Sequence, residues 1–527
     1  MPEPAVFSYD EMPYANLPFM QTHPGRLAAL AKLFGMRTPA VESCRVLELG
    51  CASGGNLIPM AMALPGARLL GIDLSTRQIA QGQQIISALG LTNIELRHAD
   101  IADVDAAYGE FDYIVSHGIY SWVPARIREK LLAICRENLA PDGVAYVSYN
   151  TLPGWGIRGI LRDAMLYHSR AAQSGAERIR QARAVLDFLA GGLPRDTPYG
   201  AVLLQDLASL GETSDAYLFH DHLEEVNEPV YFHQFVEAAQ RHGMQYLAEA
   251  EFSTMAPTGL SAETRKALRG IAPDLIAHEQ YLDLLCYRRF RQTLLVHRSV
   301  TLSRKLNAQS VQEFQIACPA QPVSPTPALA QGASETFLAP NGASISAVNA
   351  LSKAALLLLV RQWPLALPFA QLVAASRARL QEDTGGAVAA ATWERDARML
   401  GIEMLQCYAA GVVELRVWSP RLSLAASAHP VGSPLARLQS ARGAEITNLL
   451  QQRVTLDGID GALLPLLDGS RDRDALVAAL ARLAAEGALQ LEQQDKSLTH
   501  GPVSEKVLRA ALEESLSRLA RVALLLD

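Results

Sequence analysis

The sequence predicts an α/β protein that begins with a doubly wound domain around a parallel sheet. A short apolar strand at residues 45–49 runs directly into a glycine-rich turn at residues 50–55. Five strand-and-helix alternations then follow one another within about 110 residues. The second strand ends in Asp73, about twenty residues after Gly50, where a parallel strand presents a carboxylate to a ribose. Together these observations predict a nucleoside site.

Length, charge and cysteine usage limit the class of protein. A chain of 527 residues is too long for one core and predicts two to four domains. The net charge of -7, with no long basic run, argues against a nucleic-acid partner. Six isolated cysteines fit a reducing compartment. The first residues lack a signal-peptide pattern and no long apolar stretch occurs, so we expect a cytoplasmic protein without membrane insertion.

The glycine turn reads ELGCASGGN at residues 48–56. A glycine turn of this kind can serve a dinucleotide, a nucleotide or S-adenosylmethionine. A carboxylate at Glu48 would repel the pyrophosphate of a dinucleotide, whereas it could face the ammonium group in the methionine moiety of S-adenosylmethionine. The alternative is an ordinary α/β unit with a tight turn. The spacing of Asp73 and the elements that follow favour the nucleoside site.

An aromatic and proline-rich arm, residues 1–26, precedes the first strand. Such an arm could fold over the cofactor as a lid, and its candidate contacts are Tyr14, Phe19, Thr22 and His23. The alternative is that the aromatic side chains only pin the arm to the domain.

The third strand, expected at residues 94–98, is followed by Asp100 and Ile101. Asp100 could accept a hydrogen bond from the adenine amine, while Ile101 packs on the ring. Asp100 could also cap a helix, and the two roles are compatible.

The fourth strand, at 113–116, ends in SHGIYSW, and the fifth, at 144–149, ends at Tyr149. Ligands of open α/β sheets bind at the carboxyl ends of the strands. If the ligand is S-adenosylmethionine, its methyl group would be delivered there. The candidate catalytic residues are therefore His117, Tyr120, Trp122 and Tyr149, with aromatic faces that could hold an ammonium group. Trp122 and Tyr149 could instead pack behind the sheet. The N/D-P-P-Y pattern of nucleobase amino-methyltransferases is missing here.

Residues 157–318 have a mainly helical pattern, residues 319–345 a linker composition, and residues 346–527 that of a small α+β C-terminal domain. The predicted domains are thus 1–156, 157–318 and 346–527. His220 and His222 lack the spacing of a helical ligand pair, so no metal is predicted. The run LLDGSRD at 466–472 is similar to the turn of small winged-helix domains.

Several segments together closely resemble one family of class I S-adenosylmethionine-dependent methyltransferases: YDEMPY, CRVLELGCASGGNLIPMA, GIDLSTRQI, FDYIVSHGIYSWVP and NEPVYFHQFVEAA. The family has a Rossmann-like catalytic domain and a methyltransferase regulatory domain, and its members include rickettsial protein lysine methyltransferases that act on outer-membrane proteins. Ala52 replaces the middle glycine of the family's E/D-x-G-x-G-x-G run.

The resemblance implies roles for individual positions. Glu48, Gly50, Ala52 and Gly54 would hold the methionine moiety, Asp73 the ribose, Asp100 and Ile101 the adenine, and the His117 backbone the methionine amine. The predicted cofactor set is completed by Cys51, Asn56, Leu74, Tyr14 and Phe19.

We therefore expect an enzyme that methylates lysine side chains of a protein substrate, with a surface or outer-membrane protein before export as one candidate. The alternative is a small-molecule methyltransferase, but an enzyme with a small acceptor would not need the long part of the chain outside the catalytic domain. A further alternative is a non-catalytic protein that senses the cofactor or scaffolds a partner, and the intact Glu48, Asp73 and Asp100 argue against decay of the site. The acceptor and the oligomeric state stay open, with a dimer among the options.

Overall fold

The computed structural model describes residues 16–257, 259–384, 393–487, 489, 492–493, 496–497 and 504–526. These residues form two compact units. The first contains residues 16–17, 36–57 and 66–302, and the second contains residues 18–35, 58–65 and 303–526.

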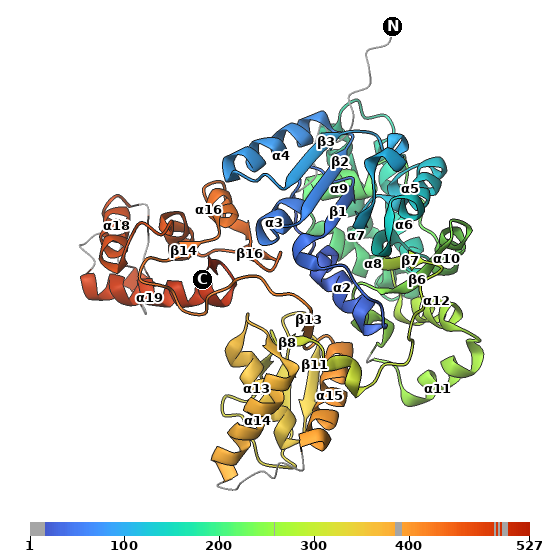
Figure 1. Cartoon of the computed structure of the whole chain (residues 1–527). Helices are drawn as coiled ribbons and strands as arrows, with labels where there is room; N and C mark the ends of the chain where they lie inside the picture. The colour runs from blue at the N-terminus through green and yellow to red at the C-terminus, as the bar shows by residue number, and fades with distance from the viewer. Residues whose placement is uncertain are drawn as a thin grey trace. The chain divides into compact units, whose positions relative to one another are not determined.

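The first unit is built around a seven-stranded sheet with the strand order β3-β2-β1-β4-β5-β7-β6 (Figure 1). The five strands β1 to β5 pair in parallel, whereas β7 runs antiparallel to both β5 and β6. The predicted α/β fold class is confirmed. The strands are β1 (Arg45–Leu49), β2 (Arg68–Asp73), β3 (Ile94–His98), β4 (Phe111–Ser116), β5 (Leu139–Asn150), β6 (Met244–Glu249) and β7 (Phe290–His297).

Helices α3 (Leu57–Ala63), α4 (Thr76–Leu89) and α5 (Ala125–Glu137) connect the parallel strands. The ends of α4 follow local sequence signals: the Ser75 hydroxyl accepts from the Gln78 N–H, and Gly90 ends the helix with φ of 65°. Apolar side chains of α5 and α10 (Phe232–Arg241) pack with those of β1, β4, β5 and β6 in one core. This core holds the carboxyl ends of the strands in fixed positions.

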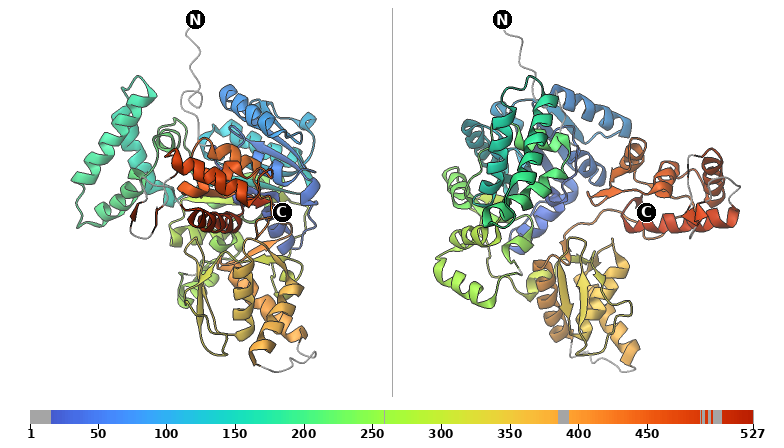
Figure 2. Two further views of the ribbon diagram at one scale, coloured as in Figure 1. Left: turned by 90° about the vertical axis from the view of Figure 1, so that its left-hand side faces the viewer. Right: turned by 180° about the vertical axis from the view of Figure 1, so that it is seen from behind.

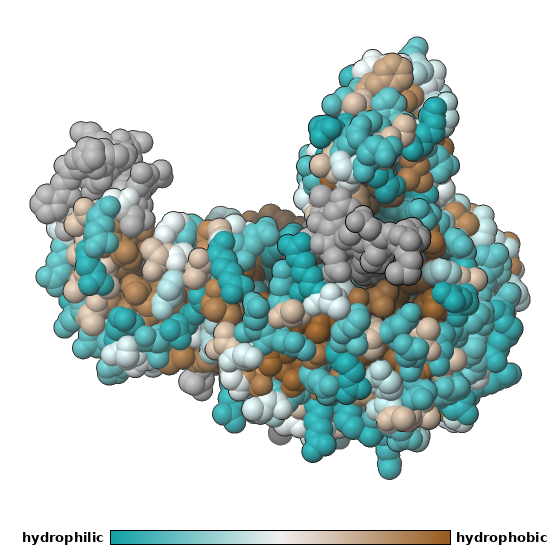
Figure 3. All heavy atoms as spheres, turned by 90° about the horizontal axis from the view of Figure 1, so that it is seen from above, coloured by the Kyte–Doolittle hydropathy of each residue, from teal (hydrophilic) through white to brown (hydrophobic). Residues whose placement is uncertain are grey.

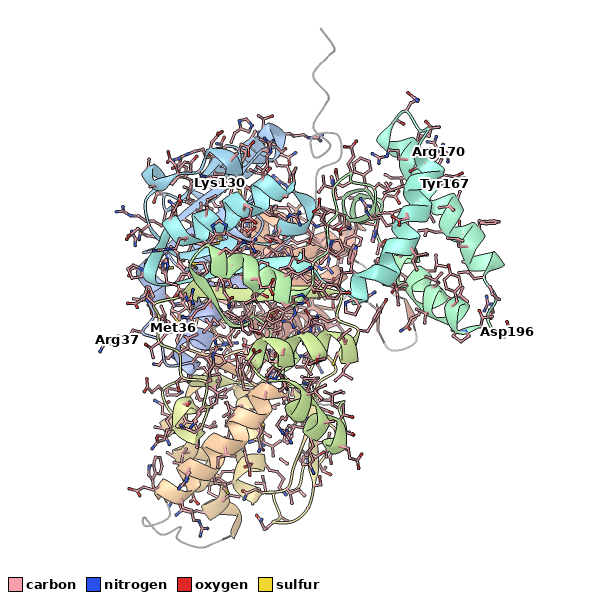
Figure 4. The ribbon with its side chains drawn as sticks, turned by 90° about the vertical axis from the view of Figure 1, so that its right-hand side faces the viewer. Met36, Arg37, Lys130, Tyr167, Arg170 and Asp196 are labelled. Carbon is pink, nitrogen blue, oxygen red and sulfur yellow. The ribbon has the colours of Figure 1, made fainter. Side chains whose placement is uncertain are left out.

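A group of helices follows β5: α6 (Gly154–Ser169), α7 (Gly175–Gly192), α8 (Pro198–Gly211) and α9 (Asp215–His222). Their leucines and Phe219 form a small core of their own. Figure 2 shows these helices packed against one another. At the end of α6, the Arg170 guanidinium lies 4.1 Å from the centroid of the Tyr167 ring (Figure 4). Two more helices, α11 (Ala262–Ile271) and α12 (Leu275–Cys286), precede β7.

The region 157–318 is not purely helical, because it contributes β6 and β7 to the sheet. Composition hides β7, since it contains the charged residue Arg291. The Arg291 side chain is nevertheless buried, and it forms ion pairs with Glu249, Glu279 and Asp283 at 2.6, 3.2 and 2.8 Å. These three carboxylates allow an arginine to lie inside the fold.

In the second unit, α2 (Pro24–Leu33) packs near β13 (Glu414–Arg416), where Arg26 and Glu414 form an ion pair. Strands β12 (Leu367–Pro368) and β13 flank β8 (Gln315–Ala317). Helices α13 (Ala350–Gln362), α14 (Phe369–Thr384) and α15 (Trp393–Ala409) belong to the same part of the chain.

The stretch 319–345, predicted to be a linker, is folded in the structure. It contains β9 (Gln321–Pro322), β10 (Glu335–Leu338) and the start of β11 (Ser344–Ala347), which form an antiparallel sheet. The linker prediction fails because composition is a poor guide here. Most residues of the stretch are small, but Phe337 of β10 is fully buried.

The last part of the chain has a leucine-rich core. Its elements are β14 (Val431–Gly432), α16 (Pro434–Ser440), β15 (Glu445–Thr447), β16 (Arg453–Thr455), α17 (Gly458–Leu463), α18 (Arg473–Ala485), β17 (Glu492–Gln493), β18 (Lys496–Ser497), α19 (Glu505–Arg521) and β19 (Leu525–Leu526). The β17–β18 hairpin lies between α18 and α19 in sequence, as the wing of a winged-helix domain does.

In the described part of the chain, no helix is both long and apolar enough to cross a membrane. Hydrophilic and hydrophobic residues are interspersed on the face that Figure 3 shows.

Candidate active site

The glycine turn is held against the end of β2. The N–H groups of Gly50 and Cys51 both donate to the Ile72 carbonyl oxygen, at 2.9 and 3.0 Å. Gly50 has φ of 77°, and a Cβ added there would lie 2.2 Å from Ile119 Cδ1. The turn therefore requires glycine at this position, and the Ile119 side chain from the loop after β4 closes over it.

Ala52 adopts a left-handed backbone conformation, with φ of 49°. Its N–H donates to Asp73 Oδ2 at 2.8 Å, and the Ser75 N–H donates to Asp73 Oδ1 at 2.9 Å. Two backbone donors thus fix the Asp73 carboxylate at the carboxyl end of β2. Each carboxylate oxygen can accept further bonds, so Asp73 fits a pair of ribose hydroxyls.

Glu48 lies near the end of β1 and is 3% exposed. Asn56 Nδ2 donates to Glu48 Oε1 at 2.8 Å, but Oε2 is buried and has no partner among the residues that the structure describes. Burial raises the pKa of Glu48 to about 8, although the bond from Asn56 acts in the opposite direction. A buried carboxylate oxygen without a donor is suited to an ammonium group, so the residues present fit the methionine end of S-adenosylmethionine.

The residues expected around the adenine lie at the ends of β2 and β3, which are paired through Asp73 and His98. Asp100 Oδ1 accepts from the Ala102 N–H at 2.8 Å and caps the short helix Ile101–Asp103, so the capping role is present. Ile101 packs against the core. Leu74 is 45% exposed, and its carbonyl oxygen is 3.0 Å from His98 Nε2.

At the carboxyl end of β4, His117 follows the strand, and its Nδ1 lies 2.8 Å from Tyr146 Oη. Phe290, at the start of β7, stands edge-on to the His117 ring at 5.9 Å. Burial lowers the pKa of His117 to about 3, so its imidazole is neutral at physiological pH. A neutral imidazole adds no positive charge at the carboxyl end of β4.

The four aromatic candidates do not line one surface. Tyr120 and Tyr149 are 4% and 1% exposed and pack on Phe235 in the core. The Tyr149 hydroxyl is bonded to Thr293 Oγ1 at 3.0 Å, and burial raises its pKa well above the usual range. Tyr149 therefore packs behind the sheet, as the alternative interpretation held.

Trp122 is more accessible than these tyrosines. Its ring stands edge-on to Trp155 of α6, with 6.3 Å between the ring centroids. Trp155 in turn lies parallel to the buried His222 ring at 6.0 Å. His222 is thus part of an aromatic stack. Among the residues described, no group of three or more His, Cys, Asp or Glu side chains is arranged to hold a metal ion.

The arm is described only from Asn16 onward, so Tyr14 lies outside the described residues. Phe19 belongs to the second unit, where its carbonyl oxygen accepts from the Thr22 hydroxyl at 2.8 Å. His23 caps α2 and stacks on Trp418. Asn16 lies instead in the first unit, against Gly55 of the glycine turn.

Sequence patterns did not single out Asn16, Ile119 or Phe290 as site residues. Their positions depend on how separate segments meet in space. The IYSW run after β4 was the one available signal for Ile119.

The fold and this site define a nucleoside-binding α/β domain of the methyltransferase class. Three family models match the chain: "Methyltransferase domain" over residues 46–143, "Predicted methyltransferase regulatory domain" over 214–297, and "PKMT, C-terminal winged helix domain" over 429–524. The winged-helix prediction for the last domain is therefore confirmed.

RP789, an uncharacterized protein of Rickettsia prowazekii, is 34% identical to the chain over 98% of this chain and 93% of its own length. A second protein of that organism, RP028, is 39% identical over 46% of this chain and 96% of its own. The structure of PKMT2 from Rickettsia typhi, also solved in complex with AdoHcy, matches with a TM-score of 0.87 and 28% identity over 98% of this chain and all of that one.

The chain belongs to the same family as RP789, a family of class I S-adenosylmethionine-dependent methyltransferases with a regulatory and a winged-helix domain. The resemblance read from the sequence is thereby confirmed, as is the cofactor.

Proposed function

We propose that this methyltransferase transfers methyl groups to lysine side chains of protein substrates in the cytoplasm. The observation that carries the proposal is the similarity to PKMT2 over nearly the whole chain, since PKMT denotes a protein lysine methyltransferase. A surface protein before its export is one candidate substrate. The large part of the chain outside the sheet supports a polypeptide acceptor, because a small molecule needs no such surface.

For the cofactor, we propose that Glu48 receives the ammonium group, Asp73 the ribose hydroxyls, and Asp100 with Ile101 the adenine. The unpartnered Glu48 Oε2 and the fixed Asp73 carboxylate support these roles. The bound cofactor supplies an electrophilic methyl group on a sulfonium.

The protein must align a neutral amine with that methyl group and exclude water. A lysine with a pKa of about 10.4 costs about 4 to 5 kcal/mol to deprotonate at pH 7. Ile119 and Phe290 offer apolar surface near the turn and His117, and apolar surroundings lower a lysine pKa. The more accessible Trp122 ring is the proposed contact for the substrate ammonium.

A dedicated general base is not part of the proposal. His117, with a pKa of about 3, holds a proton too weakly to draw one from an ammonium group. Burial raises the pKa of Tyr120 to about 12, so this hydroxyl stays protonated. Deprotonation by water before binding, helped by the apolar surroundings, is the remaining route.

The test is to incubate the protein with methyl-labelled cofactor and a lysate of its own cell, and to map the label by mass spectrometry. Label on lysine residues of proteins, absent with Asp73→Ala, supports the proposal. Label confined to small molecules identifies a small-molecule methyltransferase. Cofactor binding by calorimetry without any label identifies a non-catalytic sensor, and both results contradict the proposal.

A further inference from the structure

Asn16, the first described residue of the arm, lies against Gly55 of the glycine turn. A Cβ added to Gly55 would lie 2.2 Å from Asn16 Oδ1 and 2.6 Å from Asn16 Cγ. The Asn16 carboxamide thus occupies the place that a side chain would take, and only glycine at position 55 leaves room for it.

The Asn16 carboxamide oxygen is buried and has no hydrogen-bond partner within the described part of the chain. A buried acceptor without a donor is costly and therefore requires an explanation. If the arm only packed against the domain, a buried acceptor beside the turn would serve no purpose.

A second acceptor without a donor belongs to Glu48, near the end of the strand that precedes this turn. Gly55 is followed by Asn56, whose side chain donates to Glu48 Oε1 and leaves Glu48 Oε2 buried and unpartnered. One unpartnered acceptor thus lies against Gly55, and the other belongs to the side chain that is bonded to Asn56. A group that carries several N–H donors would satisfy both, and an ammonium group carries three.

We infer that Asn16 is a further cofactor-binding residue, whose carboxamide oxygen accepts a hydrogen bond from the methionine ammonium group together with Glu48. The inference rests on the proposed cofactor site and adds the arm to it as a contact specific to the amino-acid end. Gly55 is then a positioning residue, because its missing side chain allows Asn16 to approach.

The test compares S-adenosylhomocysteine with its deaminated analogue, which keeps the adenosine, thioether and carboxylate but lacks the ammonium group. Asn16→Leu, of similar size but without an acceptor, should weaken S-adenosylhomocysteine binding about tenfold or more, as expected for one bond to a charged group. The analogue should bind wild type and Asn16→Leu equally. Asn16→Asp, which keeps an acceptor oxygen, should retain the preference for the ammonium group. Calorimetry supplies the dissociation constants.

Gly55→Ala provides a second variant that leaves Asn16 itself intact. Its added methyl group should displace the carboxamide and reduce the same preference. Equal losses for both ligands with Asn16→Leu would mean that the arm only covers the site, and no loss for either would mean no contact. Both results overturn the inference while leaving the methyltransferase proposal standing. If wild type did not bind S-adenosylhomocysteine at all, both would fall.

Discussion

Asn56 Nδ2 donates to Glu48 Oε1 over 2.8 Å, and this bond orients a carboxyl group whose other oxygen is buried without a partner in the described chain. With a pKa of about 8, Glu48 is largely protonated at pH 7 before the cofactor binds. An ammonium ligand favours the ionised form, so binding should release about one proton below pH 8.

Calorimetry in two buffers of different ionisation enthalpy measures this release at pH 7. In Glu48→Gln, which cannot ionise, we expect no linked proton from this site and an affinity lower by about tenfold or more. Equal proton release in the variant and in wild type would exclude Glu48 as the ammonium partner.

The same pKa predicts how stability depends on pH without cofactor. The folded value of about 8 lies above the ordinary 4.5, so between these pH values the folded protein keeps a proton that the unfolded chain releases. This contribution to the free energy of unfolding is fully present below about pH 4.5 and is lost as pH rises through 8.

Wild type should therefore lose about 1.4 kcal/mol per pH unit across this range relative to Glu48→Gln. Urea denaturation of both proteins at pH 5, 6, 7 and 8 gives the difference. Parallel stability curves would contradict the raised pKa.

Asp73 accepts one backbone N–H on each carboxylate oxygen, from Ala52 and Ser75. Asp73→Asn keeps one acceptor oxygen but places an NH2 group, itself a donor, opposite the other backbone N–H. The variant should therefore destabilise the fold by about 1–3 kcal/mol. It should also weaken S-adenosylhomocysteine binding, measured by calorimetry below the unfolding temperature. Asp103→Asn, at an exposed carboxylate nearby, is the control and should bind like wild type. Unchanged affinity in Asp73→Asn would remove the ribose assignment.

Ala52 holds a backbone conformation, φ of 49°, that glycine adopts without strain. Ala52→Gly should raise the free energy of unfolding by about 0.5–1 kcal/mol and leave cofactor affinity intact. Ala133→Gly within α5 provides the opposite case and should cost about 1 kcal/mol, because its backbone is helical. A loss of stability in Ala52→Gly would show that the turn does not strain the alanine.

Trp122 is proposed to contact the acceptor and not the cofactor. Trp122→Ala should lower kcat/KM for a protein acceptor about tenfold, the effect of one cation–π contact of ~1–2 kcal/mol, with S-adenosylhomocysteine affinity unchanged. Trp393→Ala, at a partly exposed tryptophan of the second unit, should change neither quantity. Reduced cofactor affinity in Trp122→Ala would mean that this ring contacts the cofactor, which contradicts the prediction.

Much of the first five strands could be predicted from sequence, because local signals specify them. The strand expected at 94–98 has those bounds in the structure. β7 escaped prediction because Arg291 resembles a surface residue until three distant carboxylates surround it. β10 escaped because its burial depends on Phe337 within a stretch of small residues.

In the site, the positions of Glu48 and Asp73 could be predicted because these residues lie at or near the ends of two adjacent strands. Their roles toward the cofactor stay predictions. Asn16 was not readable, since its importance lies in the space left by Gly55, some forty residues away along the chain. For Tyr149 two interpretations stayed open, because the sequence places it at a strand end but does not say which face its ring covers; in the structure the ring stacks on Phe235.

The position of β7 between β5 and β6 has a consequence for biosynthesis. Because residues 290–295 pair with residues 145–150, a nascent chain that has left the ribosome only as far as α6 carries every parallel strand but leaves this edge of β5 unpaired. The sheet can close only after about 130 further residues have been translated, so this edge of β5 stays unpaired during that interval. Fragments that end near residue 156 should aggregate for the same reason.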